Sequence, residues 1–291
     1  DNATFGGAVS GITNLSVSGT TAINANITTT GTQGYAGAVT LGAGVTLATT
    51  DSNVTFSSTL NSVTSARALT ITSGTGTVTF TGAVGGTLAL GATSITAASV
   101  VHSSTLVGTS TYAITGNASF GGAVSGITNL SVSGTTGIST STITTSGTQT
   151  YTGAVTVSAA LTLSASGITT GSTIAASANA LTFTTDAIDL GGNVSSTGAL
   201  IIQPKTATTT VGIGSSASNT LNLSDTELGY LVDGFSAITL GSAAGTGAVA
   251  VNYASSYTFT DPLTIRSLSG TITATDSLTT GTNNLTITSG G

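Results

Sequence analysis

The chain has 291 residues, and only 12 of them are charged, nine acidic and three basic, while 66 Thr, 40 Ser and 40 Gly fill about half of all positions. The three cations, Arg67, Lys205 and Arg266, are too few to neutralise a nucleic-acid backbone. With no Cys and a single His, the chain also lacks the ligands for a structural zinc site or an iron–sulfur cluster, and it cannot form disulfides.

The remaining composition indicates an all-β protein. Hydrophobic residues make up 38% of the chain and the mean hydropathy is +0.44, so there is enough apolar surface for a core. Thr, Val and Ile favour strands, whereas Lys, Glu and Met, which favour helices, are almost absent. No apolar run approaches the roughly 18 residues of a membrane span, so we expect no membrane insertion. The chain opens Asp1-Asn2-Ala3, without Met or a charged leader, and we expect a mature or internal piece of a longer protein.

A long repeat begins at the N-terminus. Residues 2–21 (NATFGGAVSGITNLSVSGTT) recur at 117–136 with one difference in twenty, Thr4 against Ser119. After a one-residue insertion the match continues, because GTQGYAGAVT at 31–40 aligns with GTQTYTGAVT at 147–156. The long period is therefore about 115 residues.

A shorter motif lies inside this period and consists of an aromatic residue, any residue, Gly, Ala and Val. It occurs at Phe5–Val9, Tyr35–Val39, Phe80–Val84, Phe120–Val124 and Tyr151–Val155. A degenerate copy opens at Phe56. The spacings fit a unit of about 20 to 24 residues, sometimes doubled or stretched.

Apolar and hydroxyl residues alternate between these motifs, as in Leu69-Thr70-Ile71-Thr72 and Leu181-Thr182-Phe183-Thr184. Alternation with period two places the apolar side chains on one face of a strand and Thr or Ser on the other. Gly, Asn and Asp cluster between the runs, which is typical of turns.

From about residue 186 the short motif fades, and seven of the nine acids appear. Ser224 and Glu227 match a capping box, with Ser224 as the N-cap and Glu227 at the third helical position. This segment predicts the one helical turn of the chain. It is either a capping or specificity element or, as we favour, a short turn at a corner.

Short strands, a unit near 22 residues and small turn residues together predict a right-handed parallel β-solenoid of some 13 coils. We expect one elongated domain over 1–291, with 1–116 and 117–185 as related copies and 186–291 as more divergent coils. The alternative is a series of tandem Ig-like β-sandwiches, since about 115 residues would suit one such domain.

Three segments carry a family resemblance: VTFTGAVGGTLALGATSI (78–95), GTQTYTGAVTVSAALTL (147–163) and LNLSDTELGYLVDGFSAITLG (221–241). They resemble the repeat regions of filamentous-haemagglutinin-like, β-strand-repeat adhesins on the surface of Gram-negative bacteria. The resemblance is compositional and lies at the level of the repeats. It implies export to the cell surface and a fibrous β-helical shaft that serves in adhesion or in a biofilm matrix.

Few residues offer catalytic chemistry. His102 precedes Ser103 and Ser104, but no Gly-x-Ser-x-Gly elbow occurs, and we expect His102 in a turn or facing solvent. Carboxylates pair in the sequence at Asp186/Asp189 and Asp225/Glu227, with Asp233 more distant. The odd spacing of Asp186 and Asp189 predicts opposite faces of a continuous strand. These two acids are the weak candidates for Ca²⁺; otherwise we expect no metal, no cofactor and no enzymatic activity.

Other features are open to a functional and a structural interpretation. Thr-x-Thr steps such as Thr70/Thr72 would suit an ice-binding face if they stacked in register, which the irregular spacings disfavour. Lys205 could form a crosslink, but nothing selects its partner. Sequons occur at Asn2, Asn14, Asn26, Asn53, Asn117, Asn129, Asn193, Asn222 and Asn284, and we expect most of these Asn residues to mark turns.

The sequence therefore predicts a structural or adhesive segment of a secreted surface fibre, extracellular in location. Its expected partners are other copies of itself, joined head to tail or laterally, and host or matrix glycans. The alternatives are an ice-binding solenoid and a carbohydrate-active β-helix protein.

Overall fold

The computed structural model describes residues 1–108 and 110–290. Its contacts group into two compact units: unit 1 is Asp1–Thr140 with Thr144–Ser146, and unit 2 is Ser141–Ile143 with Gly147–Gly291. Each unit is a β-solenoid in which short strands pair in parallel with the strands one turn later, and the chain has about 14 turns in all. This confirms the predicted parallel solenoid and rules out tandem Ig-like sandwiches, whose sheets are antiparallel.

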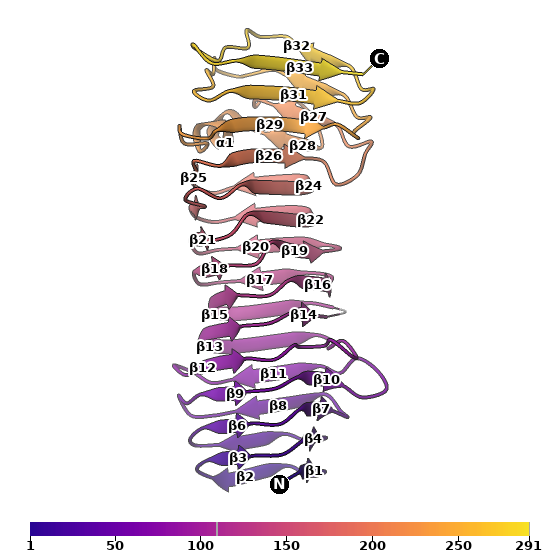
Figure 1. The fold of residues 1–291 in the computed structure, drawn as a ribbon, viewed down its shortest axis with the longest axis vertical. Coiled ribbons are helices and arrows are strands. Elements are labelled where there is room, and N and C mark those ends of the chain that lie inside the picture. Colours follow the sequence, from indigo (N-terminus) through magenta and orange to yellow (C-terminus); the bar gives the residue numbers. More distant parts are fainter. Residues whose placement is uncertain (109, 291) are drawn as a thin grey trace. The chain divides into compact units, whose positions relative to one another are not determined.

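Unit 1 has three sides, each formed by one parallel ladder of strands (Figure 1). Side 1 consists of β1 (Ala3–Phe5), β4 (Thr21–Ile23), β7 (Val39–Leu41), β10 (Leu60–Ser62), a bridge at Val84, β14 (Leu106–Val107) and β16 (Val124–Ile127). Side 2 consists of β2 (Val9–Ile12), β5 (Ile27–Thr29), β8 (Val45–Ala48), β11 (Leu69–Thr72), the first parts of β13 (Thr93–His102) and β15 (Tyr112–Phe120), and β17 (Leu130–Val132). Side 3 consists of β3 (Leu15–Val17), β6 (Gln33–Tyr35), β9 (Val54–Phe56), β12 (Thr77–Phe80), the last parts of β13 and β15, and β18 (Thr136–Ile138).

Unit 2 is built on the same plan, with sides that we name A, B and C. Strand β19 (Thr142–Thr145) lies at the boundary of the two units. Side A consists of the first halves of β22 (Leu161–Thr170) and β24 (Leu181–Leu190), then β26 (Ala199–Gln203), β29 (Ala237–Ser242), β31 (Leu263–Ser267) and β33 (Leu285–Ser289). Side B consists of β20 (Thr148–Tyr151), the second halves of β22 and β24, and a separate four-stranded sheet of β28 (Leu221–Leu223), β27 (Val211–Ile213), β30 (Val249–Val251) and β32 (Ile272–Ala274). Side C consists of β21 (Val155–Val157), β23 (Ile174–Ala175) and β25 (Val194–Ser195), followed by isolated bridges at Leu231 and between Thr258 and Thr279.

One turn of unit 2 is unusually long. Ala199 in β26 pairs with Ala237 in β29, and the chain between them forms β27, β28 and the helix α1 (Asp225–Gly229). Helix α1 has five residues. No helix in the described part of the chain is long and apolar enough to cross a membrane.

The period-two alternation produces the core as predicted. The aromatic and Val positions of the short motif point inward, and eight of the ten are buried: Tyr35, Val39, Phe80, Val84, Phe120, Val124, Tyr151 and Val155. The other two, Phe5 and Val9, lie in the first coil and are partly exposed. The motif is therefore a core motif, and each copy spans a corner at which the chain passes from one side to the next.

A buried glutamine completes two corners that are related by the long repeat. Gln33 and Gln149 have no exposed surface. The Gln33 amide donates to the carbonyl of Ala48 in the next coil at 2.9 Å, and Tyr35 Oη donates to Gln33 Oε1 at 3.0 Å. Gln149 and Tyr151 repeat this arrangement, with Ser164 as the next-coil carbonyl. The repeated Gly-Thr-Gln-x-Tyr sequence thus satisfies backbone acceptors that the corner would otherwise leave buried and unpaired.

Asparagine side chains connect consecutive coils at the surface. Asn2, Asn14, Asn26, Asn53 and Asn117 each accept a hydrogen bond from a Thr backbone N–H one coil later, at 2.8–2.9 Å. For four of them a Gly precedes that Thr. In three of these pairs, Asn2/Gly19, Asn14/Gly31 and Asn117/Gly134, a Cβ on the Gly would collide with the Asn side chain. Four of these sequon asparagines lie between strands, as predicted for most of them, and Asn117 lies within β15.

The two copies of the long repeat use the same pairing on different sides of unit 1. Phe5 pairs with Ile23 in the first copy and Phe120 with Ile138 in the second, so the register is identical. Phe5 lies on side 1, whereas Phe120 lies on side 3. The period of about 115 residues is thus not a whole number of turns, and the same sequence forms the same pairing on two different sides.

The two copies provide a matched test of how closely the coils pack. A Cβ at Gly122 would overlap the backbone of Ser104 in the coil below, whereas a Cβ at the equivalent Gly7 meets nothing within 4 Å. We expect Gly122→Ala to lower the free energy of unfolding by about 1–3 kcal/mol because the overlap must be relieved by a backbone shift. Gly7→Ala should be neutral or stabilising by about 0.4–1 kcal/mol. Urea unfolding measures both, and equal losses for the two variants would contradict the packing described here.

Candidate functional site

An aromatic column runs through the core of unit 1 along side 3. The rings of Tyr35, Phe56, Phe80, His102 and Phe120 stack face to face, with centroids 4.6–5.7 Å apart and interplanar angles of 5–15°. His102 is 1% exposed, so the prediction of a turn or solvent-facing histidine was wrong. The strand register explains this burial, because His102 pairs with Phe80 below it and with Phe120 above it.

The imidazole of His102 is held neutral. Its Nε2 lies 2.8 Å from Tyr112 Oη, and its Nδ1 has no hydrogen-bond partner among the described residues. Burial lowers the pKa of His102 to about 3. Ser103 and Ser104 follow the buried ring on the surface of the coil, and the structure places no carboxylate against it among the described interactions. His102 therefore fills a core position.

Outward hydroxyls form columns on side 2 of unit 1. Thr46, Thr70 and Ser94 are register partners, and the column continues through Ala113 to Ser131. A second column contains Thr72, Thr96 and Thr115. The expectation that irregular spacing would break such columns was wrong for these coils, because the differences in turn length fall in the corners and leave the strands in register.

A comparable column on side A of unit 2 is interrupted. Register partners follow the order Thr162, Thr182, Ile201, Thr239, Thr264, Thr286. The neighbouring column contains Gly241 and Arg266 beside Thr288. Side A therefore presents hydroxyls in the main, with an apolar residue and a cation among them.

Asp186 organises a loop of unit 2. Its carboxylate accepts hydrogen bonds from the backbone N–H groups of Lys205 and Thr206 and from the hydroxyls of Thr206 and Thr209, at 2.6–3.1 Å. Burial opposes ionisation, but these donors, Thr206 foremost, outweigh it and lower the pKa of Asp186. Both carboxylate oxygens are thus engaged by protein donors, which makes Asp186 a loop cap.

Asp189 lies on the same strand and is exposed. The predicted opposite orientation of the two acids was wrong, because the alternation of buried and exposed residues in β24 shifts phase at Asp186 and Ala187, where the strand turns a corner. Among the described residues no group of three or more acidic, His or Cys side chains is placed to hold a metal ion. Asp186 and Asp189 thus share a strand without forming a common oxygen cage.

Helix α1 begins with the predicted capping box. Ser224 is the N-cap, its hydroxyl accepts from Glu227 N, and the Glu227 carboxylate accepts from Ser224 N at 2.8 Å. The other Glu227 oxygen accepts from Leu190 N at the end of β24. Asp225 accepts from the backbone N–H groups of Ser215, Ala254 and Ser255. The two acids of this pair therefore connect turns instead of facing a common substrate space.

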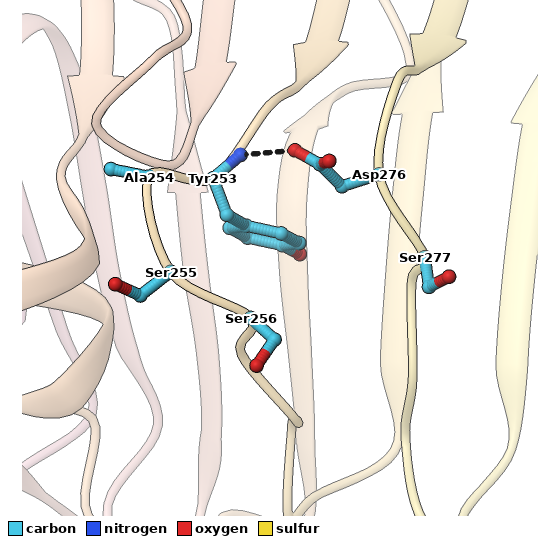
Figure 2. A pocket seen from close by; sticks show the side chains of 6 residues that line it. All are labelled: Tyr253, Ala254, Ser255, Ser256, Asp276 and Ser277. Carbon is cyan, nitrogen blue, oxygen red and sulfur yellow. Dashed lines mark hydrogen bonds between the residues drawn. The ribbon is translucent and has the colours of Figure 1, made fainter.

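A cavity of about 240 Å³ lies in the last coils of unit 2. Figure 2 shows its lining: Tyr253, Ala254, Ser255, Ser256, Asp276 and Ser277. Tyr253 N donates to Asp276 Oδ2 at 2.7 Å, while Tyr253 Oη is buried without a partner among the described residues. Burial, with contributions from Tyr257, Asp225 and Asp276, raises the pKa of Tyr253 to about 12. The cavity carries hydroxyls and one carboxylate, and it is smaller than ordinary ligand pockets of about 300–1,000 Å³.

The structure also brings Asp233 and Asp261 together, a pair that sequence reasoning missed. Asp261 is 4% exposed; its Oδ1 accepts from Gly234 N at 3.0 Å, and its Oδ2 has no donor among the described residues. Burial and the adjacent Asp233 carboxylate raise the pKa of Asp261.

His102 gives unit 1 a specific pH dependence. The unfolded chain binds a proton near pH 6.5 and the folded chain only near pH 3, so stability is full above pH 6.5 and falls as the pH drops toward 3. From pH 7 to pH 5 we expect a loss of about 2 kcal/mol. Hydrogen exchange of β13 and β15 amides measures it, and His102→Phe should abolish the loss, although it leaves Tyr112 Oη unpaired. An unchanged pH dependence in the variant would contradict a neutral, stacked His102.

Comparison with known proteins assigns this chain to no family. No family model matches the chain, and neither the curated proteins nor the solved structures include a significant match.

Proposed function

We propose that this chain is a structural and adhesive segment of a secreted surface fibre. Its role would be to provide length and stiffness outside the cell and to associate through its hydroxyl faces. The observation that carries the proposal is the parallel solenoid itself, whose coils repeat one backbone pattern while the outward positions hold Thr and Ser in register. Such a fold extends by adding coils, and each added coil covers the edge of the one before.

The use of the acidic residues supports a structural role. Asp186, Asp225, Glu227 and Asp276 accept hydrogen bonds from backbone N–H groups in neighbouring turns. Carboxylates used in this way hold loops in place, and they are not available as a general acid and base for a substrate. The proposal therefore assigns no catalytic reaction to this chain.

The chemistry of the hydroxyl-rich faces indicates which kind of binding partner fits this chain. Thr and Ser present hydrogen-bond donors and acceptors without net charge, and the three cations of the chain offer little attraction for polyanions. Neutral glycans of a host surface or an extracellular matrix, and other copies of the chain, fit such a face best. Nucleic acid is not among the proposed partners.

Ice binding is the second candidate function, favoured by the hydroxyl columns at Thr70/Thr72 and Ser94/Thr96 on side 2. An ice-binding face needs two unbroken columns on one flat side. Ala113 and Ala48 interrupt the columns on side 2. Moreover, the long repeat places the same outward residues on different sides, which is not expected if one side were dedicated to ice.

Surface location is the element of the proposal that can be tested most directly. Antibodies raised against the folded chain should label intact cells that produce it, and brief protease treatment of intact cells should remove the signal. Labelling that requires permeabilised cells would overturn the proposal. Thermal hysteresis of the purified chain, expected to be absent, would favour the ice-binding alternative if it were found.

A further inference from the structure

A buried carboxylate of unit 2 lacks a partner for one of its two oxygens. Asp261 lies in the turn before β31 and is 4% exposed. Its Oδ1 accepts a hydrogen bond from Gly234 N at 3.0 Å, whereas its Oδ2 is buried and has no donor among the described residues. A buried carboxylate oxygen without a donor is unfavourable, because the charge has lost its water and has gained too few partners. A proton or a cation must therefore neutralise it.

A second carboxylate approaches Asp261 from the turn between α1 and β29. Asp233 immediately precedes Gly234, the residue whose N–H binds Asp261 Oδ1, and Asp233 is exposed. The groups that shift the pKa of Asp261 include the Asp233 carboxylate and backbone N–H groups, and no cationic side chain is among them. The two acids therefore place negative charge at one point of the surface without a protein cation to offset it.

The wall that carries these acids borders a small surface cavity of about 190 Å³. Its lining comes from three consecutive turns: Ser177, then Ser195, Ser196 and Thr197, then Asp233 and Gly234. The main-chain oxygen of Ser196 lies 3.8 Å from the position that a Cβ on Gly234 would take. Hydroxyl and main-chain oxygens are the neutral ligands that accompany carboxylates around hard cations. The cavity thus offers both kinds of ligand.

The turns that carry the two acids lie between other described turns of unit 2. Val232 N donates to Val194 O in the turn before, and Leu263 N donates to Asn284 O in the turn after. The Asn283 side chain also donates to Thr260 O at 2.6 Å. Backbone bonds on both sides of Asp261 therefore hold this carboxylate in place, while Asp233 lies on the solvent side of the pair.

We propose that Asp233 and Asp261 bind a hard divalent cation, for which Ca²⁺ is the best match. The two carboxylates supply the charged ligands, and cavity oxygens and water complete the roughly six to eight oxygens that Ca²⁺ takes. Mg²⁺ requires a more regular octahedron and should bind more weakly. With two carboxylates we expect a dissociation constant of roughly 10⁻⁴–10⁻³ M. The bound cation would fasten the long turn of unit 2 to the coil that follows it.

A proton competes with the cation for the same oxygens. Burial and the Asp233 charge raise the pKa of Asp261, so Asp261 keeps its proton to a higher pH than an exposed aspartate. Because the cation binds the deprotonated carboxylates, its affinity should fall as the pH is lowered. Tyr257 is the other titratable group that feels the Asp261 charge. Burial and that charge raise the pKa of Tyr257, so it stays neutral throughout this range.

Thermal unfolding of the whole chain in Ca²⁺ tests the site. Asp261→Asn and Asp233→Asn each remove one charged ligand with little change in shape. Asp189→Asn is the matched control, because it removes the same charge from an exposed position on β24. Circular dichroism verifies the β structure of each variant and follows its unfolding in millimolar CaCl₂, in MgCl₂ and in NaCl of the same ionic strength.

We expect Ca²⁺ to raise the melting temperature of the wild type and of Asp189→Asn by about 2–5 °C more than NaCl does. Asp261→Asn should lose this rise, Asp233→Asn should lose most of it, and lowering the pH from about 7 to 5 should diminish it in the wild type. A wild type that does not respond to Ca²⁺, or an Asp261→Asn variant that responds equally, would overturn the site. Stability that depends on pH but not on Ca²⁺ would assign the pair to a proton alone and overturn it as well.

Terbium gives a local readout that is independent of stability. Tb³⁺ replaces Ca²⁺ at oxygen sites, and its luminescence is sensitised by nearby tyrosine rings; the chain has no Trp, and Tyr257 lies close enough to Asp261 to feel its charge. We expect tyrosine-excited Tb³⁺ emission that saturates and is displaced by Ca²⁺ in the wild type and in Asp189→Asn. Asp261→Asn should lose it. Equal emission from Asp261→Asn would place the cation elsewhere and contradict the proposal.

Discussion

Parallel backbone hydrogen bonds between one turn and the next determine where every side chain of both units lies. Most strands are only three to five residues long, and most of their hydrogen bonds are made to strands one turn away, as in the pairing of Ala118 with Thr136. A one-residue slip would exchange the inward and outward faces of a strand. The alternation of apolar and hydroxyl residues makes such a slip costly, because it would bury Thr and Ser and expose Val, Leu and Ile. The alternation of apolar and hydroxyl residues therefore fixes the register, and the register in turn keeps the apolar side chains inside the solenoid.

The number of residues per turn varies in the corners, while the strands of the ladders stay in register. Thr46 pairs with Thr70 across 24 residues, whereas Ala118 pairs with Thr136 across 18, and both pairs lie in regular parallel ladders. The extra residues form turns, where Asn side chains and closely packed Gly residues connect one coil to the next. This explains why irregular sequence spacing coexists with regular columns of side chains. It also explains why the same twenty residues can start on side 1 in one place and on side 3 in another.

Much of this could be predicted from the residues alone. Period-two alternation and the short motif indicated a parallel solenoid with Tyr35, Phe80 and Tyr151 in its core, and the capping box at Ser224 and Glu227 was located to the residue. Local patterns of this kind are decided by neighbours in the sequence. His102 could not be placed in this way, because its burial depends on alignment with Phe80 and Phe120 in other coils. The proximity of the Asp233 charge to Asp261 likewise depends on which turns become neighbours.

Because the chain has so few charged residues, nearly all of its ionisable side chains have structural roles. With so few ionisable groups, most carboxylates of unit 2 serve as hydrogen-bond acceptors for loops, and the single imidazole is a stacked core ring. Hydroxyls then provide much of the outer surface of the ladders. The proposed association with neutral glycans and with other copies of the chain rests on this uncharged surface.

The register of the ladder is the central claim, and disulfide trapping tests it most directly, because the chain contains no cysteine of its own. Thr70 and Ser94 are register partners on exposed positions of side 2, about 4.8 Å apart in a parallel ladder. Thr70 and Thr96 share the same face but are offset by two residues, about 8 Å apart, which is beyond the range of a disulfide. The double variant Thr70→Cys with Ser94→Cys should oxidise readily within one chain, whereas Thr70→Cys with Thr96→Cys should not. Equal oxidation of the two pairs, or faster oxidation of the offset pair, would contradict the account.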